Sequence, residues 1–174
     1  MHILKYLILL FFFFSSNSYC LEKISYFDLN EILDKSDAGK SLLIQLNEIN
    51  KQNIEILKKD ELKIKSLEEE IKINQNVFSS DELKKKIDIF NKELNKMRIK
   101  KDNLVEEFAK LRNKEIMNFM NIITPIIEKY MEKNSIVMII DKKNIFIAKS
   151  NYDITNDIIF LINQSIKDFK IDQK

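Results

Sequence analysis

The sequence has very few of the residues that make turns, metal sites and thiol chemistry. Its 174 residues include one glycine (Gly39), one proline (Pro125), one histidine (His2), one cysteine (Cys20) and no tryptophan. So few turn-forming residues argue against an all-β sandwich and against any fold rich in loops. A chain that has lost His2 and Cys20 would also have no zinc site of the usual kind, no disulfide and no histidine general base. We therefore expect no enzyme activity, no cofactor and no metal site.

The charge balance excludes one further class of partner. The chain has 29 lysines and arginines and 27 aspartates and glutamates, for a net charge of +2. Domains that bind nucleic acid are usually far more basic, so we expect no nucleic acid partner. The composition is 45% apolar and 32% charged, which together with the bias toward Leu, Ile, Lys and Glu is typical of long, solvated helices.

Residues 1–20 have the pattern of a secretory signal peptide. Lys5 is followed by a short uncharged apolar run and then by the small residues that lead to Cys20. A basic start, a short apolar core and a small-residue exit are the signature of such peptides, and a membrane span would need about 20 apolar residues. We predict that the segment is cleaved, after Cys20 or after Ser18. Acylation of Cys20 in a lipoprotein and an uncleaved anchor are the alternatives.

Residues 41–117 have the pattern of two long helices folded into an antiparallel hairpin, which we call the arm. Ser79 is followed by Glu82 three residues later, which is the capping box of a new helix, so we predict a turn near residues 77–81. Apolar residues of the first helix recur at multiples of seven, as in a coiled coil: Leu43, Leu57, Ile64, Ile71 and Phe78. Thr124 and Pro125 predict a kink or a restart of the second helix.

The two halves of the arm carry opposite charge. Residues 22–82 have 9 basic and 14 acidic side chains, whereas residues 83–101 have 8 basic and 2 acidic ones. An acidic helix beside a basic one favours antiparallel pairing, although exposed ion pairs each contribute only about 0.2–1 kcal/mol.

Residues 21–40 and 118–174 predict a small, β-rich body at the base of the arm. Strands are expected at about residues 24–29, 136–141 and 145–148, the last two as a β-hairpin, because these stretches are rich in β-branched and aromatic residues. Other expected features of the body are a short helix capped by Asn30, a loop at 36–40 in which Gly39 is free to adopt positive φ, a last helix at about 153–167, and a polar tail at 167–174.

The predicted body is too small to be stable as a monomer. Three short strands and one helix give a marginal core, and the strands have open edges. Self-association in a closed, cyclic oligomer would bury the strands and remove the edges.

The order of these parts resembles the Skp/OmpH family of periplasmic chaperones. Three stretches carry the resemblance: Lys23–Asp28, the pair of stretches 136–141 and 145–148, and Tyr152–Ile158. The fold class implied is α+β and mostly α, with a long coiled-coil hairpin arm (a tentacle) on a small β-rich body that forms a trimeric β-barrel. The resemblance further implies a homotrimer in the periplasm that encloses unfolded outer-membrane proteins between its arms and holds them without ATP. The alternative is a structural coiled-coil spacer or subunit of an envelope assembly.

One cluster of basic side chains and one aromatic residue are candidate contacts for clients or for an anionic lipid such as lipopolysaccharide. The alternative for the basic cluster is a solvated helix face that pairs with the acidic half of the arm, and for the aromatic residue it is a plug in the hairpin turn. The candidates are Lys84, Lys85, Lys86, Arg98, Lys100, Lys101 and Phe78.

Overall fold

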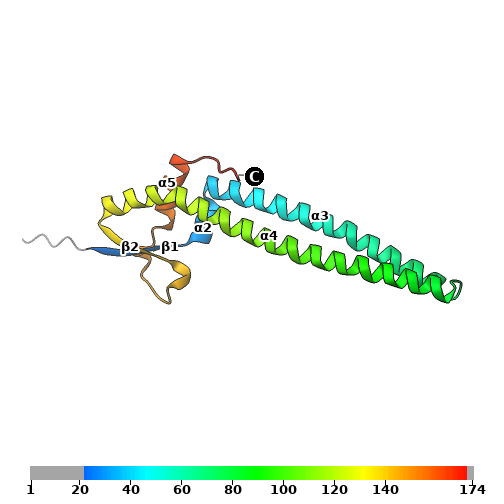
Figure 1. The fold of residues 1–174 in the computed structure, drawn as a ribbon. Coiled ribbons are helices and arrows are strands. Elements are labelled where there is room, and N and C mark those ends of the chain that lie inside the picture. Colours follow the sequence, from blue (N-terminus) through cyan, green and yellow to red (C-terminus); the bar gives the residue numbers. More distant parts are fainter. Residues whose placement is uncertain (1–21, 172–174) are drawn as a thin grey trace, which may run out of the picture.

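The computed structural model describes residues 22–171, in which one long helical hairpin extends from a small body (Figure 1). The predicted signal peptide at residues 1–20 lies outside the described residues. The elements in chain order are β1 (Lys23–Phe27), α2 (Leu29–Lys35), α3 (Asp37–Asn74), α4 (Ser80–Asn134), β2 (Ile136–Asp141), the 3₁₀ turns η1 (Lys142–Asn144) and η2 (Ser150–Tyr152), and α5 (Thr155–Ser165).

The predicted hairpin of long helices is confirmed, with its turn two residues earlier than expected. Helix α3 has 38 residues and α4 has 55, and they lie side by side in Figure 1. The Ser79 side chain accepts a hydrogen bond from the backbone of Glu82, whose carboxylate accepts one from the Ser79 backbone at 3.0 Å. This capping box fixes the start of α4, as the sequence predicted.

Helix α4 continues through Pro125, so the predicted restart does not occur. Proline removes one backbone donor from the helix interior. In the same turn the Thr124 hydroxyl donates to the Met120 carbonyl oxygen at 2.8 Å. The helix ends at Asn134 and is followed by Ser135, which adopts a left-handed conformation with φ of 54°.

The sheet has two parallel strands, and the predicted β-hairpin at 136–148 is wrong. Strand β1 pairs with β2 in parallel, with Ile24 opposite Met138 and Phe27 opposite Asp141. The turn η1 then carries the chain away from β2, because the Asp141 carboxylate accepts a hydrogen bond from the Lys143 backbone. Residues 145–148 consequently have no neighbouring backbone to pair with and form no strand.

The expected loop at residues 36–40 is also wrong, since only Ser36 separates α2 from α3. Gly39 lies inside α3 and does not have positive φ. Its role is close packing, because a Cβ atom at this position would lie 2.4 Å from the Leu33 carbonyl oxygen. The cap of α2 is Asp28 rather than Asn30, with the Asp28 carboxylate accepting from the Glu31 backbone at 3.1 Å.

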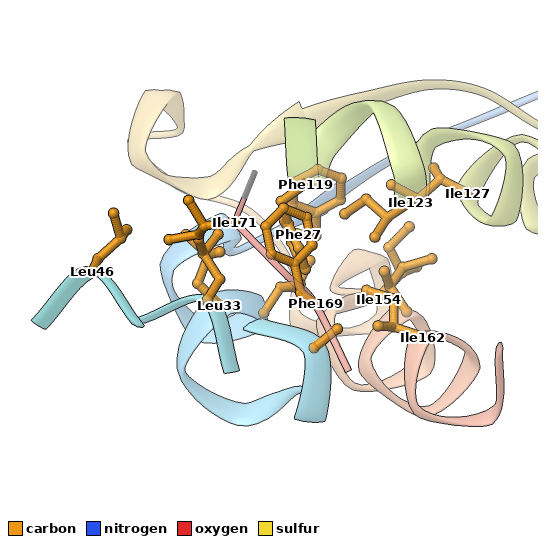
Figure 2. Close-up of a cluster of buried hydrophobic side chains, with 14 of the residues drawn as sticks. Phe27, Leu33, Leu46, Phe119, Ile123, Ile127, Ile154, Ile162, Phe169 and Ile171 are labelled. Atoms are coloured by element: carbon orange, nitrogen blue, oxygen red, sulfur yellow. The ribbon is translucent and has the colours of Figure 1, made fainter. Parts of the chain in front are cut away.

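A single apolar cluster gathers where the arm meets the body (Figure 2). Phe119 and Ile123 from α4, Leu42 from α3, and Ile158 from α5 are all fully buried in it. The predicted polar tail is wrong in one respect, since its residues Phe169 and Ile171 complete the same cluster. Among the described residues, no helix has the length and apolarity that crossing a membrane requires.

We predict that Gly39→Ala lowers the free energy of unfolding by about 2 kcal/mol, within the range known for overpacked cores. The obstacle is the Leu33 backbone 2.4 Å from the new Cβ, which no rotamer change can relieve. Urea unfolding measures the change. The exposed neighbour Lys40→Ala is the control and should stay within about 0.5 kcal/mol of the parent. Equal stability of Gly39→Ala and the parent would contradict this account of Gly39.

Candidate functional site

Two of the basic candidates are used to join the two arm helices. Lys86 contacts Glu70 at 2.5 Å and Lys100 contacts Asp60 at 2.7 Å, each bond running from α4 to α3. A third bond in the opposite direction joins Lys63 of α3 to Glu93 of α4 at 2.7 Å. These bonds confirm that the unlike halves of the arm pair with each other.

The other basic candidates are free of such bonds. Lys84, Lys85, Arg98 and Lys101 are exposed, and no ion pair involves them among residues 22–171. Lys84 and Lys85 lie near the tip of the arm, whereas Arg98 lies roughly 20 Å further along α4 at 1.5 Å per residue. The structure therefore spreads the unpaired charges along the arm and does not gather them into one site.

Phe78 lies at the tip, in the turn between α3 and α4, where it is half-buried. Its backbone N–H donates to the Asn74 carbonyl oxygen at 3.0 Å, which holds the turn. Its neighbours at the tip are more accessible, since Ile73 is 77% exposed and Val77 is 79% exposed. Phe78 was predicted from the sequence as a contact residue, whereas Ile73 and Val77 were not.

Large aliphatic side chains outside the helix seam stay exposed along the whole arm. The sequence could have revealed these exposed residues, because isoleucines and valines that lie outside the heptad positions of the seam do not face the partner helix. On α3 the exposed residues are Ile44, Ile54, Ile56, Leu62 and Ile73, in the turn after it Val77, and on the arm portion of α4 Ile89, Ile99, Val105 and Met117. The arm thus offers many small apolar contacts interleaved with charge, which suits adaptable binding of unlike partners.

The body has an uncovered apolar face of its own. Phe146 and Ile147 are almost fully exposed, and the groove beside them is lined by Ile24, Tyr26 and Ile140 from the two strands. In the described sheet the order is β1–β2, so one edge of β2 has no partner. An unpaired edge beside exposed apolar residues is a typical site of strand pairing with another chain.

A second groove of about 450 Å³ lies between α4 and α5, with Tyr130 and Asp157 in its wall. The Tyr130 hydroxyl donates to the Asp157 carboxylate at 2.5 Å. Burial, reinforced by this hydrogen bond, raises the pKa of Tyr130 to about 12, so the phenol keeps its proton at neutral pH. No group of acidic, histidine or cysteine side chains among residues 22–171 is arranged to hold a metal ion.

Glu93 carries the largest electrostatic perturbation of the arm. Hydrogen bonds from Lys63 and then from Lys96 lower the pKa of its carboxyl to about 2, from an ordinary value of 4.5. The ionised carboxylate therefore stabilises the arm above about pH 4.5, and the effect is lost as the pH falls toward 2. The side chains are solvated, so salt screens the effect.

We predict that Glu93→Gln lowers the thermal midpoint of the arm at pH 7 by a small amount, and that the difference disappears at pH 2. Circular dichroism melts at pH 7, 4 and 2 measure it, with and without added salt. Asp88→Asn on the same helix is the control, because Asp88 is exposed and has no ion pair among the described residues. An equal difference in thermal midpoint between Glu93→Gln and the parent at pH 7 and at pH 2 would contradict the assignment of this stabilisation to the ionised Glu93 carboxylate.

Comparisons with known proteins give one family. The model of the family described as outer membrane protein (OmpH-like) matches residues 23–161, from β1 into α5. The crystal structure of a candidate outer membrane chaperone (OmpH-like) from Caulobacter crescentus CB15 matches with a TM-score of 0.70 and 16% identity. The match covers 88% of this chain and 94% of that one, and at this identity it shows a shared fold. No curated protein sequence matches the chain significantly.

The family match covers most of the chain, including both strands and both helices of the arm. It confirms the resemblance drawn from Lys23–Asp28, residues 136–148 and Tyr152–Ile158. The chain therefore belongs to the OmpH-like family.

Proposed function

We propose that this protein is an ATP-independent holdase chaperone that encloses unfolded outer-membrane proteins between helical arms and prevents their aggregation. The observation that carries the proposal is the row of exposed aliphatic side chains along the arm, such as Ile54, Leu62 and Ile99. Family membership supports the same conclusion, because a structural relative with the same fold is described as a candidate outer membrane chaperone.

The arm binds clients through many weak contacts. Fully burying one isoleucine contributes about 1.5–3 kcal/mol, and a contact on an open helix surface buries only part of the side chain. A client that touches several such residues is held firmly, yet each contact can break by itself, so release needs no nucleotide. The only glycine, Gly39, is packed inside α3 and is not part of a phosphate-binding loop.

Enclosure requires more than one arm, so the proposal includes a homotrimer. The uncovered apolar face of the body, with the exposed Phe146 and with Ile147 in a groove beside the two strands, supports strand pairing between copies, as does the open edge of β2. Residues 145–148 would then be paired by another chain in a closed β-barrel, as the family resemblance implied, and three arms would surround one cavity. Export to the periplasm by the predicted signal peptide is part of the same proposal.

We predict that Phe146→Asp converts the trimer into a monomer, because a charge in the middle of the interface would be desolvated without a partner. Light scattering on the mature protein measures the mass, which should fall from three times the monomer mass to one. Phe160→Asp is the matched control, since Phe160 is also exposed but lies on α5. A parent protein that is monomeric at micromolar concentration would contradict the trimer proposal.

The unpaired cations Lys84, Lys85 and Arg98 are proposed as a second, electrostatic contact for acidic clients or for the phosphates of lipopolysaccharide or an anionic bilayer. Lys101, which is likewise exposed and has no ion pair among residues 22–171, belongs to the same proposed contact, together with Lys86 and Lys100. Lys86 and Lys100 are the weaker members because Glu70 and Asp60 already neutralise them. Phe78 at the tip, with Ile73 and Val77, supplies the apolar part of this contact.

The direct test is suppression of aggregation. We expect the purified protein to keep several unrelated unfolded β-barrel proteins soluble after dilution from urea, without nucleotide. The triple variant Lys84→Gln, Lys85→Gln, Arg98→Gln should bind acidic clients several-fold more weakly at low salt and equally at high salt. The control triple Lys58→Gln, Lys59→Gln, Lys65→Gln removes the same charge from α3 and should change binding little.

Failure to protect any of these clients would remove the holdase proposal. The structural alternative, a coiled-coil spacer with one dedicated partner in an envelope assembly, would then be favoured.

A further inference from the structure

The end of the described chain lies across the base of the arm as an extended segment. Residues 166–171, which we call the strap, follow α5 and run back to the first turns of α3 (Figure 1). Ile166 ends α5 in an extended conformation, with φ of −137° and ψ of 114°. The strap then contacts α3 through Ser41 and Gln45.

The strap has the pattern of a β-strand that is buried on one face. Phe169 is 5% exposed and Ile171 is 8% exposed, whereas Asp168 and Lys170 are exposed to solvent. Side chains that alternate between buried and exposed are the mark of an extended chain lying on an apolar surface. Phe169 meets the fully buried ring of Phe119 edge-on, with the ring centres 6.0 Å apart (Figure 2).

Gln45 recognises the backbone of the strap in the way that a neighbouring strand would. Its amide nitrogen donates to the Phe169 carbonyl oxygen at 2.5 Å, and its amide oxygen accepts from the Ile171 N–H at 3.1 Å. In an extended chain these two groups lie on the same edge, so one glutamine side chain satisfies both. The Ser41 hydroxyl also reaches the Phe169 carbonyl oxygen, at 3.0 Å.

None of these backbone bonds depends on which side chains the bound segment carries. Specificity comes mainly from the apolar positions, where an aromatic residue packs on Phe119 and an aliphatic residue follows two positions later. One polar side chain of the strap is also bound, since the Ser41 hydroxyl donates to the Asp168 carboxylate at 2.6 Å. Main-chain hydrogen bonds combined with pockets for alternate side chains are the recognition mode of strand addition. The strap also leaves a neighbouring hollow of about 540 Å³, lined by Ser41, Ile44 and Gln45.

We propose that the groove under the strap is a receptor for extended, alternately apolar segments of client chains, and that the strap is its built-in competitor. This inference rests on the proposed chaperone function and adds a defined binding site to it. Strands of outer-membrane barrels alternate apolar and polar residues, so an unfolded barrel protein carries many segments of the required pattern. The groove lies at the base of the arm, whereas the exposed aliphatic residues of the arm extend to its tip.

The strap sets a threshold for client binding. A segment tethered next to its own site acts at a millimolar effective concentration, so a single weak segment does not displace it. A client that is already held by the arm is itself present at high local concentration and competes on equal terms. The groove is thereby closed to stray peptides and open to captured clients.

A fluorescent peptide with the sequence of residues 165–174 tests the site by anisotropy on the full mature protein. We expect weak binding to the parent and at least about tenfold tighter binding to Phe169→Ala, in which the strap has lost its anchor. Binding should be lost again in Phe169→Ala, Gln45→Ala. Lys170→Ala changes an exposed strap residue and should behave like the parent. A peptide with serine in place of Phe169 and Ile171 should not bind.

Two results would overturn the inference. The first is that a Phe169→Ala variant with native helicity does not bind the peptide, and the second is that this variant and the parent bind it equally well. A second measurement applies to the parent protein and does not depend on the folding of any variant. Hydrogen exchange at the Ile171 amide should accelerate when an unfolded barrel protein is bound, because its bond to Gln45 is broken. Unchanged exchange at saturating client would equally overturn the proposal.

The two proposals fail in distinguishable ways. If clients stay soluble while the Ile171 amide remains protected, the groove is only structural and the holdase function stands. If the peptide binds Phe169→Ala but no client is protected from aggregation, the groove exists as a peptide site and the holdase function falls.

Discussion

The contact of Phe119 and Ile123 with side chains from three other elements is the interaction on which the described structure depends. These two residues of α4 are fully buried against a cluster that also contains Leu42 of α3, Ile32 of α2 and Ile158 of α5. The cluster lies at one end of the molecule, and the arm beyond it has only a two-helix seam. Local opening of the arm therefore costs less free energy than opening of the body, which is the property expected of an element that adapts to partners.

Part of the charge in the arm is paired within the arm, and this changes how clients are expected to bind. Lys86 and Lys100 neutralise acidic residues of α3, and Glu93 accepts from two lysines at once. The remaining cations are spread along α4 beside exposed isoleucines. Under the proposed function, capture would depend on apolar contact, and charge would tune which clients approach and how salt affects their binding. A strongly basic relative would divide these roles differently.

The sequence predicted the parts of the fold that depend on local periodicity and capping. The heptad of α3, the capping box at Ser79 and the apolar run of β2 each encode their element within a few residues. Prediction from the sequence failed where the local structure depends on residues far away in the chain or in another chain. Residues 145–148 have strand-like side chains but no backbone to pair with in one chain. The strap has only three apolar residues, and Gln45 lies more than a hundred positions away in sequence. The single glycine indicated that position 39 has a special backbone environment. The sequence cannot tell whether glycine is needed there for positive φ or for close packing.

The parallel pairing of β1 with β2 means that the arm is, in topological terms, an insertion between the two strands of one sheet. The strands are separated by more than a hundred residues, so their pairing is a strongly non-local contact that is slow to form from an unstructured chain. The antiparallel arm removes most of that separation, since its helices form from local contacts and return the chain to the body, where Leu42 of α3 and Phe119 of α4 lie in one cluster. Closing the sheet then costs the entropy of a short loop instead of a long one. Until β2 has been synthesised, the apolar face of β1 has no partner, and the protein is briefly the same kind of unfolded chain that it is proposed to protect.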